Sequence, residues 1–144
     1  MAGGAESPAT RGRVLVVDDE MHLRLFIKAV FESAGYETAM ARDGGEGLEK
    51  LRQFKPDLVS LDLMMPNQGG IRFLTGLRRD PEFCATKVLV VSAIEGETFR
   101  HSLALLQAGP DGGVAGPDGY VEKPPTAKLL LDEAERILAK GAGR

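Results

Sequence analysis

Five polar residues each stand at, or just behind, the end of a short apolar run: Asp18, Asp19, Asp62, Ser92 and Lys123. Three of these runs have strand length and are rich in β-branched residues: 14–17, 58–61 and 88–91. Continuous apolarity indicates strands covered on both faces, as in a parallel sheet. In open α/β sheets, ligands bind beyond the carboxyl ends of the strands. The sequence therefore predicts that the five side chains meet at one rim of a sheet.

This combination of side chains suits phosphoryl transfer. Three converging carboxylates cannot all stay ionised at low cost without a cation, and oxygen ligands with retained waters suit Mg²⁺. Bound Mg²⁺ can neutralise phosphoryl oxygens while an aspartate attacks phosphorus. A lysine supplies a point charge for a phosphate, and a serine hydroxyl can donate to a phosphoryl oxygen.

Each of these residues also has a purely structural explanation. The pair Asp18-Asp19 can cap a helix, and Asp62 can simply end a strand. Ser92 can bond to the backbone, and Lys123 can lie in an exposed turn. Independent accidents do not bring all five residues to the same rim, so we interpret the set as a functional site.

Helical periodicity separates the strand-like runs. Apolar residues at three- and four-residue spacing, Phe26 among them, predict a first helix that stops at Gly35. Further helices are predicted at 46–54, 70–79, 97–108 and 126–140, the last with Thr126 as its N-cap. Two weaker strands, 36–41 and 120–121, are expected at the sheet edges. This order predicts a doubly wound α/β fold with helices on both faces of a five-stranded parallel sheet.

The composition narrows the class of protein. The 144 residues fit one domain, expected over 12–141 behind a disordered tail at 1–11. The net charge of −3 argues against nucleic acid or an anionic membrane as partner. No apolar run approaches the ~20 residues of a membrane span, and no signal peptide is evident. A lone cysteine, Cys84, favours a reducing, cytoplasmic location and is expected to be a packing residue.

Four segments resemble the motifs of CheY-like receiver domains of bacterial two-component response regulators: 14–20, 56–70, 88–93 and 120–124. The first resembles the family's opening strand with its acidic pair. In the second, Pro66 and Gly70 stand four and eight positions after Asp62, as in the family's phosphorylation segment. The third resembles the strand that carries a hydroxyl, and the fourth resembles the last strand with its aromatic residue and lysine. The resemblance covers about residues 12 to 140.

The resemblance implies a role for each site residue. Asp62 would be the phosphoacceptor, and Asp18, Asp19, Asp62 and the backbone carbonyl of Met64 would hold Mg²⁺. Ser92 and Lys123 would contact the phosphoryl group.

Two further roles concern the switch and its lifetime. Tyr120 would be the aromatic switch that follows the movement of Ser92. In the resembled family, the positions of Met64 and Ile94 flank the path of the hydrolytic water. Because both side chains are apolar, we expect slow dephosphorylation.

The resemblance also implies a strand order of 2-1-3-4-5, as in flavodoxin-like folds. It implies a sensor histidine kinase or a histidine phosphotransfer protein as phosphodonor. Output would pass to a downstream protein through the face of the fourth helix, fifth strand and fifth helix. The expected protein is a single-domain response regulator. It is a phosphoacceptor switch that catalyses its own phosphorylation and dephosphorylation, and not an enzyme acting on a separate substrate.

Two features depart from the family pattern. Pro125 follows Pro124 at a position where the family usually has an aromatic residue. The segment 109–119, rich in glycine, proline and aspartate, stands where such a connection usually takes about 2–6 residues. We expect it to be a mobile surface loop beside the output face.

Two other classes of protein remain as alternatives. A phosphatase of the haloacid-dehalogenase type also uses a strand-end aspartate with Mg²⁺, but it needs a second aspartate where Met64 stands. A degenerate receiver binds partners without being phosphorylated, but all five site residues are present in this chain.

Overall fold

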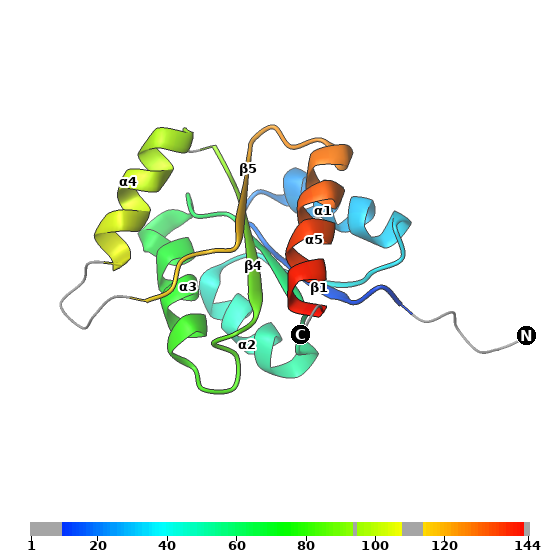
Figure 1. Cartoon of the computed structure of the whole chain (residues 1–144), viewed down its shortest axis with the longest axis horizontal. Coiled ribbons are helices and arrows are strands. Elements are labelled where there is room, and N and C mark those ends of the chain that lie inside the picture. The colour runs from blue at the N-terminus through cyan, green and yellow to red at the C-terminus, as the bar shows by residue number, and fades with distance from the viewer. Residues whose placement is uncertain (1–9, 94, 108–113, 143–144) are drawn as a thin grey trace, which may run out of the picture.

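The computed structural model describes residues 10–93, 95–107 and 114–142, in which strands and helices alternate along the chain (Figure 1). The strands are β1 (Arg13–Val17), β2 (Glu37–Ala41), β3 (Leu58–Leu61), β4 (Lys87–Ser92) and β5 (Gly119–Glu122). The helices are α1 (Met21–Ser33), α2 (Gly44–Phe54), α3 (Gly69–Arg79), α4 (Gly96–Gln107) and α5 (Ala127–Ala142). A short 3-10 turn, η1 (Pro66–Gln68), precedes α3.

The strands form one parallel sheet in the order β2-β1-β3-β4-β5, so the predicted fold class and strand order are confirmed. The two weaker strands, β2 and β5, are the edges, as expected. Helices α1 and α5 cover one face, and α2 and α3 cover the other, with α4 beside the β4–β5 side (Figure 1). Because all strands run the same way, their carboxyl ends meet at one rim.

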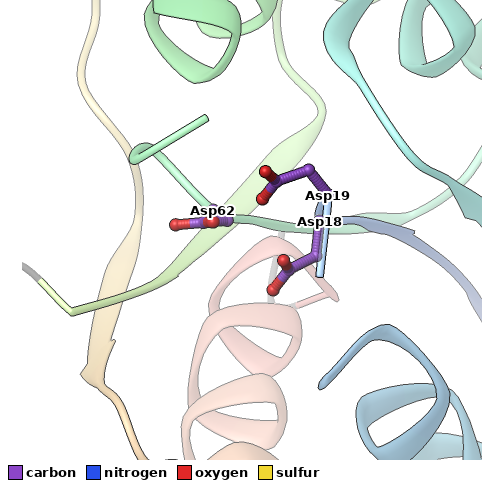
Figure 2. A group of neighbouring side chains, drawn as sticks. All are labelled: Asp18, Asp19 and Asp62. Atoms are coloured by element: carbon purple, nitrogen blue, oxygen red, sulfur yellow. The ribbon is translucent and has the colours of Figure 1, made fainter. Parts of the chain in front are cut away.

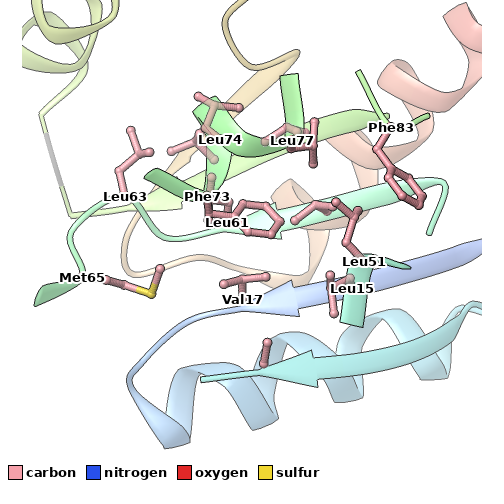
Figure 3. Packing of buried hydrophobic residues seen from close by; sticks show 14 of the residues in the cluster. Leu15, Val17, Leu51, Leu61, Leu63, Met65, Phe73, Leu74, Leu77 and Phe83 are labelled. Atoms are coloured by element: carbon pink, nitrogen blue, oxygen red, sulfur yellow. The ribbon is translucent and has the colours of Figure 1, made fainter. Parts of the chain in front are cut away.

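Alternate residues of the central strands feed two separate cores. Leu15 and Val17 of β1 pack with residues of α2 and α3, whereas Val14 and Val16 pack with α1 and α5. All four residues are completely buried. Figure 3 shows the first core, where leucine and phenylalanine side chains of α3 lie over β1 and β3. This two-sided burial explains why these strands read as continuous apolar runs.

Local hydrogen bonds set the helix ends. Helix α1 ends before Gly35, whose φ of +99° is a left-handed conformation that glycine adopts at low cost. Helix α2 starts with a reciprocal cap, in which Asp43 accepts from the amide of Glu46 and Glu46 accepts from that of Arg42. The hydroxyl of Thr126 accepts from the amide of Leu129, so the predicted N-cap of α5 is confirmed.

Two predictions about packing are wrong. Phe26 is 41% exposed, because it lies at the margin of the apolar stripe of α1 and not on the covered face. Cys84 is exposed in the connection between α3 and β4, and its sulfur lies 3.8 Å from the carbonyl of Pro81.

The connection from α4 to β5 is fixed to the fold over the part that the structure describes. Residues 108–113 lie outside the described residues. Over 114–118, the guanidinium of Arg78 donates to the carbonyls of Ala115 and Gly116 and to the carboxylate of Asp118. The side chain of Arg78 is only 5% exposed. Residues 114–118 form neither helix nor strand, as expected of a loop, and Arg78 attaches this loop to α3.

The chain entering β1 is attached as well. Residues 1–9 of the expected tail lie outside the described residues. Arg11 donates its amide to the carbonyl of Gly35 and pairs with Glu135 of α5 at 2.8 Å. Across the described ranges, no helix has both the length and the apolar character needed to cross a membrane.

Candidate functional site

Three carboxylates meet where β1 and β3 end. These strands are neighbours in the sheet, and two backbone bonds continue past their ends: Asp18 N donates to Ala41 O, and Asp62 N donates to Val17 O. One carboxylate oxygen from each of Asp18, Asp19 and Asp62 lies within 4.8 Å of the others. Figure 2 shows the three side chains together, two on the chain leaving β1 and one on the chain leaving β3.

The three carboxylates differ in exposure. Asp18 is 1% exposed and Asp62 is 3% exposed, whereas Asp19 is exposed. A cavity of about 570 Å³ adjoins Asp19, and the first residues of α2 and α3 line its wall. Solvent therefore reaches the cluster from the side of Asp19.

Lys123 supplies a cation to this cluster. Its Nζ lies 3.1 Å from Asp18 Oδ2 and 3.4 Å from Asp62 Oδ2. Its backbone amide donates to the carbonyl of Ser92, which ties the chain leaving β5 to the end of β4. One ammonium thus pairs with two carboxylates of a cluster of three, so the site keeps an excess of negative charge.

The buried charges shift each other's pKa. Burial raises the pKa of Asp18 above its ordinary value, and the charge of Asp62 adds to this, although the amide of Glu20 and the ammonium of Lys123 oppose it. Burial alone would lower the pKa of Lys123, but the charges of Asp18 and Asp62 outweigh it, so its pKa is raised. Burial therefore favours the protonated form of Asp18, while the raised pKa of Lys123 keeps its ammonium protonated.

Backbone and arginine donors hold the carboxylates in place. Asp18 Oδ1 accepts from the amide of Glu20 at 2.9 Å, and Arg24 donates to the Asp18 carbonyl at 2.8 Å. Asp62 Oδ1 accepts from the amide of Met64 at 3.0 Å. Among the described residues, Asp18 Oδ2 is buried without a hydrogen-bond partner, and it faces Nζ of Lys123 as an ion pair at 3.1 Å. An unsatisfied buried oxygen beside two more carboxylates fits a cation ligand.

Ser92 lies at the end of the neighbouring strand β4. It is completely buried, and its hydroxyl has no hydrogen-bond partner among the described residues. A buried hydroxyl without a partner costs free energy. This cost is consistent with a side chain that gains a partner in another state of the protein.

Gly70 allows α3 to start directly against the chain that leaves β3. A Cβ at this position would lie 2.5 Å from both the carbonyl oxygen of Asp62 and the Cα of Leu63. Real Cβ atoms do not approach backbone this closely, so any larger residue would displace the chain that carries Asp62. The glycine eight positions after Asp62 thus has a steric reason.

The remaining predicted residues lie around this centre. The Met64 side chain is 59% exposed, and Ile94 lies outside the described residues. Tyr120 is half-buried on β5, and its ring stacks on that of Phe99 from α4, with centroids 4.6 Å apart. The structure thus brings together Asp18, Asp19, Asp62 and Lys123 directly, with Ser92 on the adjoining strand end.

Three residues with notable contacts were not predicted: Arg24 beside Asp18, Phe99 beside Tyr120, and Arg78, which lies away from the site at the amino ends of β4 and β5. Arg24 carries a weak signal, since it stands near the start of the helix that directly follows Asp18. Arg78 and Phe99 carry none, because their partners are distant in the sequence and are backbone carbonyls or a ring face.

Comparison with known proteins agrees with this geometry. Residues 14–135 match the family described as the response regulator receiver domain. The chain is 31% identical over 127 residues to the protein PilH of Pseudomonas aeruginosa, covering 88% of this chain and 98% of PilH. The chemotaxis response regulator CheY4 of Vibrio cholerae superposes with a TM-score of 0.75 at 26% identity, covering 89% of this chain and 99% of CheY4.

Other relatives are much longer. The CAI-1 autoinducer sensor kinase/phosphatase CqsS of Vibrio cholerae is 34% identical over 121 residues, which are 84% of this chain and only 16% of that protein. The chain therefore spans about a sixth of this relative.

A parallel five-stranded sheet with an acidic cluster at its carboxyl rim defines a class of phosphorylation-dependent signalling domain. This chain belongs to the response regulator receiver domain family.

Proposed function

We propose that this chain is a Mg²⁺-dependent phosphorylation switch that works as a single-domain response regulator, with Asp62 as its phosphoacceptor. One observation carries the assignment. The Asp62 carboxylate is buried at the strand-end rim, with Oδ1 on the amide of Met64 and Oδ2 facing Lys123. Asp18 is also buried, held by a backbone amide and paired with Lys123, but it follows β1. Asp62 follows β3, which lies between β1 and β4, so it stands between the acidic pair and Ser92.

Mg²⁺ would be held by Asp18, Asp19, Asp62 and the backbone carbonyl of Met64. The mutual approach of the three carboxylates supports this assignment, as does Asp18 Oδ2, which is buried without a hydrogen bond to any described residue. When bound, the ion supplies positive charge that neutralises the phosphoryl oxygens.

The transfer itself is a displacement at phosphorus. A carboxylate oxygen of Asp62 forms the new bond while the phosphorus–nitrogen bond of a phosphohistidine breaks, and the electron pair stays on the imidazole nitrogen. Lys123 offsets the negative charge on the phosphoryl group, and the Ser92 hydroxyl donates to a phosphoryl oxygen. The donor is a sensor histidine kinase or a histidine phosphotransfer protein.

The output and lifetime of the signal follow from the surrounding residues. Tyr120 follows the movement of Ser92, and the face of α4, β5 and α5 binds a downstream protein in the cytoplasm. The apolar side chains of Met64 and Ile94 cannot hold a water in line with phosphorus. The phosphorylated form is therefore expected to be long-lived.

Phosphotransfer from a small donor tests the acceptor assignment. Incubation with acetyl phosphate and Mg²⁺ should add one phosphoryl group, which mass spectrometry of the intact protein and of its peptides would place on Asp62. Asp62→Asn should lose the modification, whereas Asp132→Asn, which removes an exposed carboxylate on α5, should keep it. Undiminished labelling of Asp62→Asn would falsify the assignment.

A further inference from the structure

Tyr120 and Phe99 form a stacked aromatic pair between β5 and α4. Their ring centroids are 4.6 Å apart and their planes differ by 16°. Phe99 is 7% exposed and belongs to the same core as Val90 of β4, whereas Tyr120 packs against that core from its edge. The other aromatic pair among the described residues, Phe31 and Tyr36, has an edge-to-face geometry with planes at 87°.

Strand register places this pair on the same side of the sheet as Ser92. Tyr120 pairs with Val90, and both side chains belong to the core on the α3 side. Ser92 comes two residues after Val90, and residues two apart on a strand point to the same face. The Ser92 hydroxyl, which is buried and has no hydrogen bond with the described part of the chain, therefore lies on the sheet face that α4 covers through Phe99.

We propose that Phe99 is the positioning residue through which α4 responds to the state of Tyr120. The stack holds Tyr120 in the unphosphorylated arrangement, and phosphoryl acceptance at Asp62 breaks the stack when Ser92 turns toward the phosphoryl group. Helix α4 loses this contact and changes the surface that it offers. This inference rests on the proposed function of Asp62, Ser92 and Tyr120.

Because of the stack, phosphorylation and the rearrangement of α4 favour each other. An aromatic pair of this kind favours the stacked state by roughly two- to tenfold. Weakening the stack should therefore raise the affinity for a phosphoryl mimic by the same factor. By linkage, a partner that draws Phe99 away from Tyr120 favours phosphorylation equally. A merely structural Phe99 would stabilise the fold without changing this affinity.

The amino-acid composition offers a direct probe. The chain has two tyrosines and no tryptophan, so Tyr36→Phe leaves Tyr120 as its sole tyrosine. Labelling this variant with fluorotyrosine gives one ¹⁹F resonance, which reports the ring current of Phe99. We expect this resonance to shift when beryllofluoride and Mg²⁺ are added. It should move toward its position in the unliganded Phe99→Leu protein, because both changes remove the stacked ring.

Matched variants distinguish the effect of losing the stack from the effect of a smaller side chain in the core. Phe99→Leu should bind beryllofluoride roughly two- to tenfold more tightly, and Phe99→Tyr, which keeps a ring, should restore the parent affinity. Phe83→Leu should leave affinity unchanged, because Phe83 is a buried phenylalanine of the same core (Figure 3) that forms no ring pair with Tyr120.

The outcomes distinguish this inference from the function on which it rests. The ¹⁹F signals of bound beryllofluoride show independently whether the mimic binds. If the mimic binds and the Tyr120 resonance keeps the same offset from the Phe99→Leu protein, the stack does not break and this inference is wrong. Equal affinities of Phe99→Leu and Phe83→Leu would also overturn it. If the mimic does not bind at all, the proposed function fails together with the inference.

Discussion

The buried carboxylate of Asp18 makes the folded protein less stable when it is ionised. It is 1% exposed, and burial raises its pKa because the ionised form loses water. The folded state therefore holds the proton more tightly than the unfolded state does. The stabilising contribution of the protonated form is complete below the unfolded pKa and is lost as the pH rises through the folded pKa. At neutral pH in Mg²⁺-free buffer, the ionised carboxylate thus lowers the free energy of unfolding.

This sign leads to a prediction for Asp18→Asn, a neutral variant of the same shape. Without Mg²⁺ at pH 7, its free energy of unfolding should exceed that of the parent protein by on the order of 1 kcal/mol. The difference should shrink as the pH falls toward the unfolded pKa, because the parent protein then takes up the proton. Urea unfolding at several pH values measures both quantities. A variant that is less stable than the parent protein at pH 7 would contradict the sign.

At the scale of elements, Arg78 joins three parts of the chain. Its guanidinium donates to the carbonyls of Cys84 and Thr86 before β4, and to Ala115, Gly116 and Asp118 before β5. The carboxylate of Asp118 in turn accepts from the amide of Val88, and its own amide donates to Val88 O. These bonds set the register of β5, a four-residue edge strand that leads to Lys123.

We therefore expect Arg78→Lys to loosen β5 specifically. A lysine keeps the charge but lacks the planar fork, so several carbonyls lose their donor. The free energy of unfolding should fall by about 2 kcal/mol, and amide hydrogen exchange should speed up most in β5. Arg52→Lys is a matched control, because Arg52 is an exposed arginine that bonds to one carbonyl of its own helix. Equal exchange rates in β5 for the two variants would show that Arg78 does not hold this strand.

The elements that the sequence predicts well are those with local signals. The continuous apolar runs predict β1, β3 and β4, because burial on both faces leaves no polar alternation. Thr126 predicts the start of α5, because its hydroxyl accepts from the amide of a residue only three positions later. By contrast, the prediction that Phe26 is buried is wrong, since helical periodicity does not say how wide a part of the helix surface the sheet covers. Arg78 is missed because its partners are carbonyls, which every residue carries.

At the scale of the whole molecule, the topology assembles the candidate site from distant parts of the chain. Asp18, Asp62 and Lys123 lie in three different loops, and parallel pairing of β1, β3, β4 and β5 brings these loops to one rim. The residue types and their strand-end positions could be predicted from the sequence. The burial of Asp18 and the lack of a hydrogen bond from its Oδ2 to any described residue could not, because they depend on how the loops pack.

The assembled carboxylates should couple Mg²⁺ binding to the stability of the entire fold. A ligand that binds only the folded state adds RT ln(1 + [L]/Kd) to the free energy of unfolding, or about 1.4 kcal/mol at ten times Kd. Thermal unfolding in MgCl₂, compared with NaCl of equal ionic strength, should therefore show a higher Tm. In Asp19→Ala, this increase should be smaller at every Mg²⁺ concentration.

The choice of Asp19 separates metal binding from folding. Asp19 is exposed and makes no hydrogen bond or ion pair with any residue that the structure describes. Its removal should therefore leave the metal-free Tm unchanged or raise it, since one of three like charges is gone. Glu49→Ala removes an exposed carboxylate of α2 outside the cluster and should keep the full response to Mg²⁺. The same Mg²⁺-dependent increase in Asp19→Ala and Glu49→Ala would mean that the ion stabilises the protein without using this site.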